Sequence, residues 1–316
     1  MKTVIELNGL TKSYGGKVLA VNNLTFSVDK GAILGFVGPN GAGKTTTIRM
    51  LTGLLNPTSG SAWINGYDVE TQLSKVKRSI GYLPQDFGLY EYMSVYEYLD
   101  LVGKMYGIRS GRKEAYSRTL ETVGLDHLSK RKIATLSTGE KQRLGIAQTI
   151  VHDPEIIFLD EPTSSLDPIG RREAYQVLSK MTLEGKTVFI SSHILAELTK
   201  VITNVVVITE GNLLFSGSVK ALLSKASRPD QRSQLKLSFR KLDERLVERI
   251  KKSPWIENVS RLTNSELSVE VRDPEQARID LVKLIASSDS ILDSFTSTSG
   301  DLEGVILDMI SKAKGN

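Results

Sequence analysis

The sequence contains no cysteine. Disulfide bonds and thiolate metal sites are therefore excluded, and the cytosol is the compartment expected for this chain. Long apolar runs are also missing, because the longest stretch, 201–208, is interrupted by Thr203 and Asn204 and fits a strand better than a membrane span. The first residues lack the features of a signal peptide. We therefore expect a chain that does not enter a membrane by itself.

Basic blocks are scarce too, although the net charge is +5. The short basic runs at 130–132, 171–172 and 251–252 are interleaved with acidic residues. Such runs are typical of solvated faces rather than of a nucleic-acid surface, so we expect no nucleic-acid partner. The length of 316 residues is enough for two domains.

A glycine-rich stretch at 38–46 is the feature around which the rest of the chain is organised. It follows the apolar run 32–37, which predicts a buried strand, and precedes a helical pattern over 46–55. Strand, turn and helix in this order match the phosphate-binding pattern G-x-x-x-x-G-K-[ST]. Lys44 can reach the β- and γ-phosphates of a nucleotide, and the hydroxyl of Thr45 can ligate Mg²⁺. The residues of this loop are Gly38, Pro39, Asn40, Gly41, Ala42, Gly43, Lys44, Thr45 and Thr46.

Two carboxylates follow the run 155–159, which predicts another buried strand. Burying the charged side chains of Asp160 and Glu161 at the tip of such a strand costs free energy, unless they bind a ligand or take part in a reaction. Asp160 can hold Mg²⁺, and Glu161 can polarise an attacking water. His193 follows the predicted strand 187–192 and could hydrogen-bond a γ-phosphate. Strands that alternate with helices and carry such residues at their tips predict an open α/β sheet with a ligand at its carboxyl edge.

Three further positions allow two interpretations each. Tyr14, beside a glycine turn, could stack on a base or be an ordinary turn residue. Gln85, after the predicted strand 79–83, could contact a ligand or metal or simply lie on the surface. Ser137 forms a capping box with Glu140, and the helix that it opens could bind a phosphate or be a plain capped helix.

The segment from 86 to 132 is predicted to be helical. A capping box at 94–97 opens one helix, and Gly124 ends a second. The two histidines outside the strand tips, His127 and His152, are predicted surface residues. Four tyrosines gather in this segment and fit either half-buried packing or an interface with another protein. They are Tyr90, Tyr92, Tyr96 and Tyr98.

Taken together, five separated motifs resemble those of an ABC-type ATPase. They are the loop 38–46, Gln85, the run 136–140, the strand ending in Asp160-Glu161, and His193. The chain looks like the nucleotide-binding subunit of an ABC transporter over about its first 220 residues. The resemblance implies a P-loop NTPase domain of the α/β class, with a parallel core sheet, an antiparallel β subdomain and a helical subdomain at about 86–152.

The resemblance also implies a role for each matching catalytic residue. Gln85 matches the glutamine that contacts Mg²⁺ and senses the transmembrane partner. Asp160 matches the Mg²⁺-linked aspartate, and Glu161 matches the catalytic base. His193 matches the switch histidine on the γ-phosphate. ATP and Mg²⁺ are therefore the expected cofactors, and hydrolysis of ATP is the expected reaction.

Four further residues match positions that hold ATP between two subunits. Tyr14 matches the aromatic residue that stacks on adenine, and Asp167 matches the aspartate of the loop that crosses between subunits. In this family two domains meet head to tail, so Ser137 and Gly139 would reach ATP in trans. We expect a homodimer or a heterodimer with a second ABC ATPase, peripheral on the inner face of the cell membrane. Its opening would drive transmembrane permease subunits, whose coupling helices the 86–132 region receives.

The likeness departs from the family pattern at the helix that Ser137 opens. The family motif is usually Leu-Ser-Gly-Gly-Gln, whereas this sequence has Leu-Ser-Thr-Gly-Glu at 136–140. Thr138 adds a Cβ where the backbone needs close approach, and Glu140 brings a carboxylate toward an anion. We expect a functional site whose ATP-driven closure is weakened. A second departure, Ser165 in place of a common glycine, should matter little.

A small second domain is predicted beyond a polar linker at 224–234. Residues 235–316 show strand and helix patterns in the order βαββαβ, which is typical of a ferredoxin-like domain. We see no catalytic constellation there and expect either a regulatory or dimer-stabilising role or an inert appendage. The ATPase domain is expected to span residues 1–223.

The layout of one ATPase domain with a short C-terminal tail is similar to subunits of the prokaryotic drug- and antibiotic-exporting branch. The runs 167–173, 191–195 and 301–306 are similar to that branch too, so export is favoured over import. One alternative is a soluble ABC ATPase acting on ribosomes or nucleic acid, but these usually carry two such domains and no internal repeat is present. A non-hydrolysing regulatory subunit would lack Glu161 or His193, and both are present.

Overall fold

The computed structural model describes residues 2–16, 18–193, 198–226, 233–297 and 302–314. The chain divides into two compact units, residues 1–218 and residues 219–315. Within the described ranges, no helix is long and apolar enough to cross a membrane. Parts of two sequence runs used above, 194–195 and 301, lie outside the described residues.

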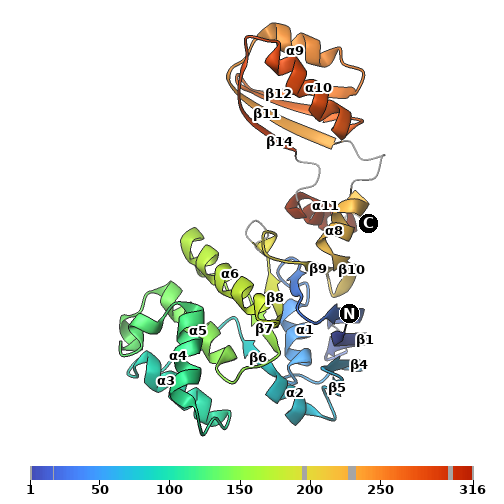
Figure 1. The fold of residues 1–316 in the computed structure, drawn as a ribbon. Coiled ribbons are helices and arrows are strands. Elements are labelled where there is room, and N and C mark those ends of the chain that lie inside the picture. Colours follow the sequence, from blue (N-terminus) through green and yellow to red (C-terminus); the bar gives the residue numbers. More distant parts are fainter. Residues whose placement is uncertain (1, 17, 194–197, 227–232, 298–301, 315–316) are drawn as a thin grey trace. The chain divides into compact units, whose positions relative to one another are not determined.

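A six-stranded sheet forms the centre of the first unit (Figure 1). Its order is β10-β9-β3-β8-β7-β6, and its pairs are parallel except for β9 with β10. Every residue of β3, β7 and β8 is buried, as expected for parallel strands covered on both faces. The strands are β3 (Ile33–Val37), β6 (Ile80–Leu83), β7 (Ile156–Asp160), β8 (Thr187–Ser192), β9 (Asn204–Thr209) and β10 (Asn212–Ser218).

A second, antiparallel sheet packs against the first through a shared apolar core. Its order is β2-β1-β4-β5. Side chains of β2 point alternately to the solvent and to the core, and Phe26 points into the core. The centre of its ring lies 5.9 Å from that of Phe36 on β3. Phe36 in turn lies 5.1 Å from Phe189 on the neighbouring strand β8, so Phe26 of the second sheet packs against an aromatic cluster of the central sheet. The strands are β1 (Thr3–Tyr14), β2 (Val18–Asp29), β4 (Ser59–Ile64) and β5 (Tyr67–Asp68).

Helices complete the first unit, and three of them, α3, α4 and α5, gather on the side of the central sheet away from β1 and β4 (Figure 1). Both predicted capping boxes are present: Ser94 with Glu97 opens α3, and Ser137 with Glu140 opens α5. Gly124 ends α4 in the left-handed conformation. The helices are α1 (Lys44–Leu51), α2 (Leu73–Ser79), α3 (Val95–Met105), α4 (Arg112–Val123), α5 (Thr138–Ile150) and α6 (Pro168–Leu183), with short 3-10 turns at Asp126–Leu128 and Ile133–Thr135.

The helix predicted over 46–55 differs from the observed α1 at both ends. It begins at Lys44, directly after the glycine loop, and it stops at Leu51. The stop follows from Gly53, whose φ of 66° cannot continue a right-handed helix. The first helical N–H groups therefore lie against the glycine loop rather than beyond it.

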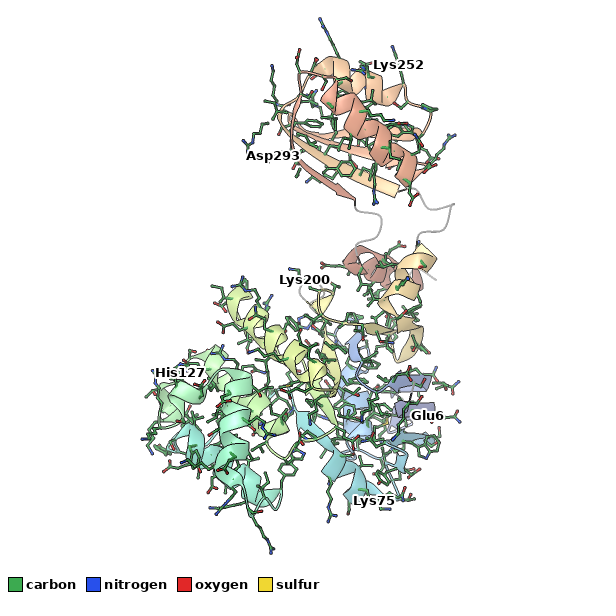
Figure 2. The ribbon with its side chains drawn as sticks, viewed as in Figure 1. Glu6, Lys75, His127, Lys200, Lys252 and Asp293 are labelled. Atoms are coloured by element: carbon green, nitrogen blue, oxygen red, sulfur yellow. The ribbon has the colours of Figure 1, made fainter. Side chains whose placement is uncertain are left out.

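The two histidines predicted on the surface have different environments. His127 points outward, and 66% of its side chain is exposed (Figure 2). For His152 the prediction is wrong: its ring stacks on Tyr106 at 3.7 Å, and its Nε2 lies 2.9 Å from the carbonyl oxygen of Ile80. Burial lowers the pKa of His152, so its imidazole is neutral at physiological pH. The end of α5 packs onto β6, and periodicity within one helix does not reveal such a contact.

The second unit contains a four-stranded antiparallel sheet in the order β12-β13-β11-β14. This order, with βαββαβ connectivity, is that of the predicted ferredoxin-like domain. Side chains from the sheet, α9 and α10 form its apolar core. Two further helices, α8 and α11, contact each other. The elements are α8 (Val219–Ala226), β11 (Ser233–Lys241), α9 (Glu244–Lys251), β12 (Ile256–Thr263), β13 (Glu266–Val271), α10 (Pro274–Ala286), β14 (Ile291–Ser297) and α11 (Leu302–Lys314).

The linker predicted at 224–234 is partly structured. Helix α8 runs across the predicted boundary after residue 223. Leu222 lies on its apolar face and is buried, which stabilises the helix. Strand β11 already begins at Ser233. The middle of the linker, 227–232, lies outside the described residues.

Candidate functional site

A cavity of about 530 Å³ lies at the carboxyl ends of the central strands. It brings together side chains that are far apart in the sequence: Gln85 follows β6, Glu161 follows β7, and His193 follows β8. Ligands of open α/β sheets bind at this edge, so the location agrees with the predicted one. The cavity is lined by Tyr14, Val18, Ala20, Asn40, Gly41, Gly43, Lys44, Thr45, Thr46, Gln85, Glu161 and His193.

The glycine loop needs glycine for steric reasons at two positions. A Cβ on Gly38 would collide with the carbonyl oxygen of Ile208, and one on Gly43 would collide with that of Ala20. Gly43 also has a φ of 102° and caps α1 without a side-chain hydrogen bond. The first N–H groups of α1 are therefore available to an anion, and the helix dipole favours a phosphate at this end.

Lys44 is 6% exposed and lies inside the loop. Its Nζ donates to the carbonyl oxygens of Gly38 at 2.8 Å and Pro39 at 3.2 Å. The same Nζ lies 3.3 Å from Glu161 Oε1. Lys44 thus pairs with backbone carbonyls and with a carboxylate at the position where the phosphate loop would hold a polyphosphate.

Glu161 has an unusual backbone conformation and is 8% exposed. Its φ is 51°, in the left-handed region, which costs about 1–2 kcal/mol for a residue with a Cβ. Its Oε2 lies 2.8 Å from Nδ1 of His193, while its Oε1 faces Lys44. Glu161 therefore contacts both Lys44 and His193 in the lining of the cavity, and its carboxylate lies where a water could be deprotonated.

Asp160 is the last residue of β7 and is 1% exposed. Its Oδ1 accepts a hydrogen bond of 2.6 Å from the hydroxyl of Ser191. Its Oδ2 is buried and has no hydrogen-bond partner among the described residues. A buried carboxylate oxygen without a partner is costly, and a bound cation would satisfy it. Asp160 directly precedes Glu161, which lines the cavity together with Thr45 and Gln85, and oxygen donors of this kind suit Mg²⁺.

Seven predicted site residues are not among those that line this cavity. Gly38, Pro39 and Ala42 belong to the glycine loop and Asp160 to the end of β7, whereas Ser137, Gly139 and Asp167 lie at the starts of α5 and α6. Ser137 is the N-cap of α5, where its Oγ accepts from Glu140 N at 3.2 Å and its own N donates to Glu140 Oε2 at 2.7 Å. The hydrogen bond from the Ser137 backbone lowers the pKa of Glu140, so this end of α5 carries a carboxylate at neutral pH. Gly139 belongs to the first turn of the same helix, and Asp167 caps α6 through Gly170.

Sequence reasoning missed Ser191. It is fully buried on β8, opposite Asp160 in the parallel register, and its hydroxyl contacts both acidic residues. A serine near the end of a predicted strand was a possible signal. Its partner, however, is set by the pairing of β7 with β8, which the sequence does not reveal.

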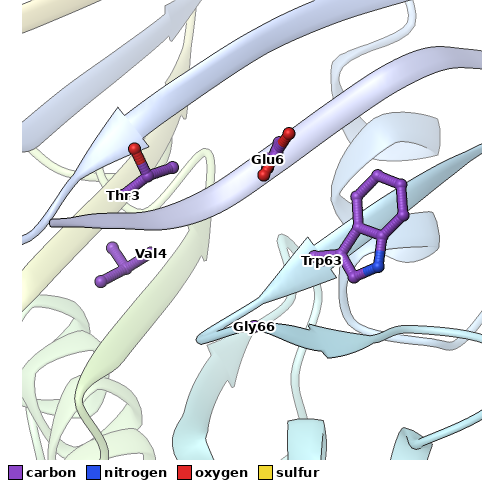
Figure 3. A pocket seen from close by; sticks show the side chains of 5 residues that line it. All are labelled: Thr3, Val4, Glu6, Trp63 and Gly66. Carbon is purple, nitrogen blue, oxygen red and sulfur yellow. The ribbon is translucent and has the colours of Figure 1, made fainter.

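A second cavity, of about 220 Å³, lies on the antiparallel sheet (Figure 3). Glu6 on β1 and Trp63 on β4 are directly opposite each other there. Glu6 contributes the one titratable side chain among the described residues that line it, so a catalytic pair like that of the larger cavity is missing. This cavity is lined by Thr3, Val4, Glu6, Trp63 and Gly66.

The glycine loop, the carboxylates at the tip of β7 and the histidine after β8 define an ATP-binding cassette. The model of the family "ABC transporter" matches residues 21–164. The bacitracin transport ATP-binding protein BcrA of Bacillus licheniformis is 44% identical over 215 residues, which are 68% of this chain and 69% of that protein. The linearmycin resistance ATP-binding protein LnrL of Bacillus subtilis is 35% identical, over 70% of this chain and 71% of that protein.

Solved structures show the same fold. CbiO1 of Clostridium perfringens, part of the ABC transporter complex cbiONQ, is 27% identical with a TM-score of 0.65, covering 71% of this chain and 92% of that one. The dimeric bacterial ABC transporter cassette MJ0796 is 27% identical with a TM-score of 0.61, covering 68% of this chain and 98% of that one. This chain belongs to the ATP-binding subunits of ABC transporters. It binds ATP and is an ATPase that powers transport.

Proposed function

We propose that this chain hydrolyses Mg-ATP at the 530 Å³ cavity and thereby drives an exporter. The observation that carries the proposal is the pairing of the buried side chains of Lys44 and Glu161 with His193, next to the unpartnered Oδ2 of Asp160. Export is supported by the relatives, one of which takes part in bacitracin transport and another in linearmycin resistance. The expected placement is the inner face of the membrane, against transmembrane permease subunits.

The proposed roles follow from the geometry. Lys44 exchanges its two carbonyl partners for the β- and γ-phosphates, and Tyr14 borders the cavity where the base would stack. Mg²⁺, when bound, would neutralise phosphate charge, and Asp160, Thr45 and Gln85 are the residues that would hold it. Glu161 accepts a proton from the attacking water. His193, at 2.8 Å from Glu161, orients that carboxylate and contacts the γ-phosphate.

The positions of Ser137, Gly139 and Asp167 outside the cavity support an ATP sandwich. In that arrangement a second ATPase, either a copy of this chain or a different one, supplies the N-terminus of its α5 to the ATP bound here. The N-terminus of α5, with Ser137 as its N-cap, is exposed and suited to binding a γ-phosphate. Hydrolysis would remove that phosphate and open the pair.

Dimerisation is tested by the concentration dependence of the activity. The rate of phosphate release per chain should rise with chain concentration and then level off, because each site is completed by a second chain. Ser137→Ala should lower the plateau at least about tenfold, since it removes a charge-assisted contact with the γ-phosphate. Ser94→Ala removes the same kind of N-cap from α3 and should leave the plateau unchanged.

A rate per chain that stays constant over the concentration range would contradict the sandwich. Negligible activity that appears only with a co-purified membrane protein or a second ATPase would instead identify an obligate subunit of a larger assembly. The soluble alternative, an ABC ATPase acting on ribosomes or nucleic acid, predicts activity that no membrane partner changes.

The departures from the family motif should weaken closure on ATP. Glu140 is ionised and would face an incoming phosphate, so Glu140→Gln should lower the apparent Michaelis constant for ATP about two- to fivefold. The amide oxygen of glutamine can still accept from Ser137 N. Glu97→Gln makes the same change in the capping box of α3 and should leave the constant unaltered. Steady-state kinetics of the unmodified chain and of the two variants measure this constant. An unchanged Michaelis constant for ATP in Glu140→Gln would contradict the proposal that Glu140 weakens closure.

A groove in the helical layer is the proposed contact for the permease subunits. It measures about 600 Å³, and two of its apolar residues are strongly exposed: Met105 at 79% and Tyr90 at 62%. Tyr98 forms the floor; its hydroxyl donates to Gln148, and burial raises its pKa to about 12. The groove begins just after Gln85, so a helix seated in it would touch the segment that leads to the cavity. It is lined by Gly88, Leu89, Tyr90, Tyr98, Leu101, Val102, Met105, Tyr106 and Gln148.

A further inference from the structure

Ser191 holds both acidic residues of the site with one side chain. It lies on β8 and is fully buried. Its Oγ donates to Asp160 Oδ1 at 2.6 Å and accepts from the backbone N–H of Glu161 at 3.0 Å. The same N–H also lies 3.2 Å from the carbonyl oxygen of Ser191.

The register of the sheet brings these groups together. Strands β7 and β8 are parallel neighbours, and Asp160 is paired with Ser191. Paired residues on adjacent strands point to the same face of the sheet. The short side chain of Ser191 is therefore close enough to bond the carboxylate of Asp160 directly. A hydroxyl donating to a carboxylate at 2.6 Å is a strong, charge-assisted hydrogen bond.

Two consequences follow for the chemistry. The terminal torsion of an aspartate is soft, so a carboxylate without a fixed partner can rotate and exchange its oxygens. The bond from Ser191 engages Oδ1 and leaves Oδ2 as the unpartnered oxygen. The hydroxyl and the carbonyl of Ser191 also hold the N–H of Glu161, whose φ of 51° is unfavourable for a residue with a Cβ.

We infer that Ser191 is a positioning residue, which aims Asp160 Oδ2 at the metal of Mg-ATP and holds the backbone of Glu161 in its left-handed conformation. This inference rests on the proposed function, because it needs a divalent cation between Asp160 and the phosphates. Partners that orient metal ligands commonly change metal affinity about 10- to 100-fold when they are removed. The effect of Ser191 should therefore depend on the metal rather than on the nucleotide.

The test measures ATP binding to the full chain with Mg²⁺ and, separately, with EDTA, using a fluorescent ATP analogue. In the unmodified protein Mg²⁺ should tighten binding. In Ser191→Ala the tightening by Mg²⁺ should shrink about tenfold, while binding in EDTA stays the same. The metal concentration at half-maximal binding should rise accordingly. Ser191→Thr restores a hydroxyl and should recover the effect of Mg²⁺.

Ser192→Ala is the matched control, because it removes a buried serine from the next position of β8. It should leave the effect of Mg²⁺ unchanged. If Ser191→Ala does not fold, Ser191→Cys keeps the volume but donates only weakly, and it should show the same loss. An effect of Mg²⁺ in Ser191→Ala and Ser191→Cys equal to that of the unmodified chain would overturn the inference. No effect of Mg²⁺ in the unmodified chain would instead contradict the proposed metal site itself.

Discussion

Glu161→Gln should lower the steady-state rate of ATP hydrolysis about 10²- to 10⁴-fold and leave ATP binding intact. Glutamine has nearly the shape of glutamate, so the contacts with Lys44 and His193 keep their geometry. It cannot accept a proton from water at neutral pH, and the chemical step therefore loses its base. The measurement is phosphate release by the purified full chain at a concentration where the unmodified protein has reached its plateau.

The same substitution should make bound ATP longer-lived. It removes one negative charge from a site that receives the γ-phosphate, so repulsion between the two falls. Glu155→Gln is the matched control, because Glu155 precedes the opposite end of β7 and is 57% exposed. It should retain the normal rate. If Glu161→Gln keeps more than about a tenth of the normal rate, below the loss expected for a general base, another group deprotonates the water.

Lys44→Ala should weaken ATP binding about 10- to 100-fold. A hydrogen bond to a charged group contributes about 1.5–3 kcal/mol, and each 1.4 kcal/mol corresponds to about a tenfold change in affinity. Lys44 is nearly buried and already directed into the loop by Gly38 and Pro39, so little ordering is needed when phosphate arrives. Titration with a fluorescent ATP analogue measures the change directly.

Removal of Lys44 also leaves Glu161, whose side chain is 7% exposed, without its cation. A buried carboxylate that loses its lysine partner is destabilising, so the nucleotide-free variant should unfold at a lower temperature. Lys30→Ala is the control: Lys30 pairs with exposed Glu155 and should affect neither binding nor unfolding. Normal ATP affinity in Lys44→Ala would show that the lysine does not reach the phosphates.

Local patterns carried much of the prediction. The phosphate loop, the capping boxes at Ser94 and Ser137, and the stop at Gly124 depend on residues within a few positions of one another. The βαββαβ order of the C-terminal domain follows from the succession of periodic segments. These features could be predicted because capping, turn geometry and side-chain periodicity act over short distances along the chain. Helix α1 was misplaced only at its ends, since Gly53 stops it earlier than the apolar pattern suggests.

The sequence by itself determined the family, the residue types of the site and the strand tips on which they lie. Only the tertiary structure decided which atoms meet: Lys44 with Glu161, Glu161 with His193, and Ser191 with both acidic residues. The stacking of His152 on Tyr106 was likewise beyond local reasoning. The physical reason is that these contacts depend on the order and register of parallel strands and on helix packing. Both are set by burial summed over the whole unit and not by any one segment.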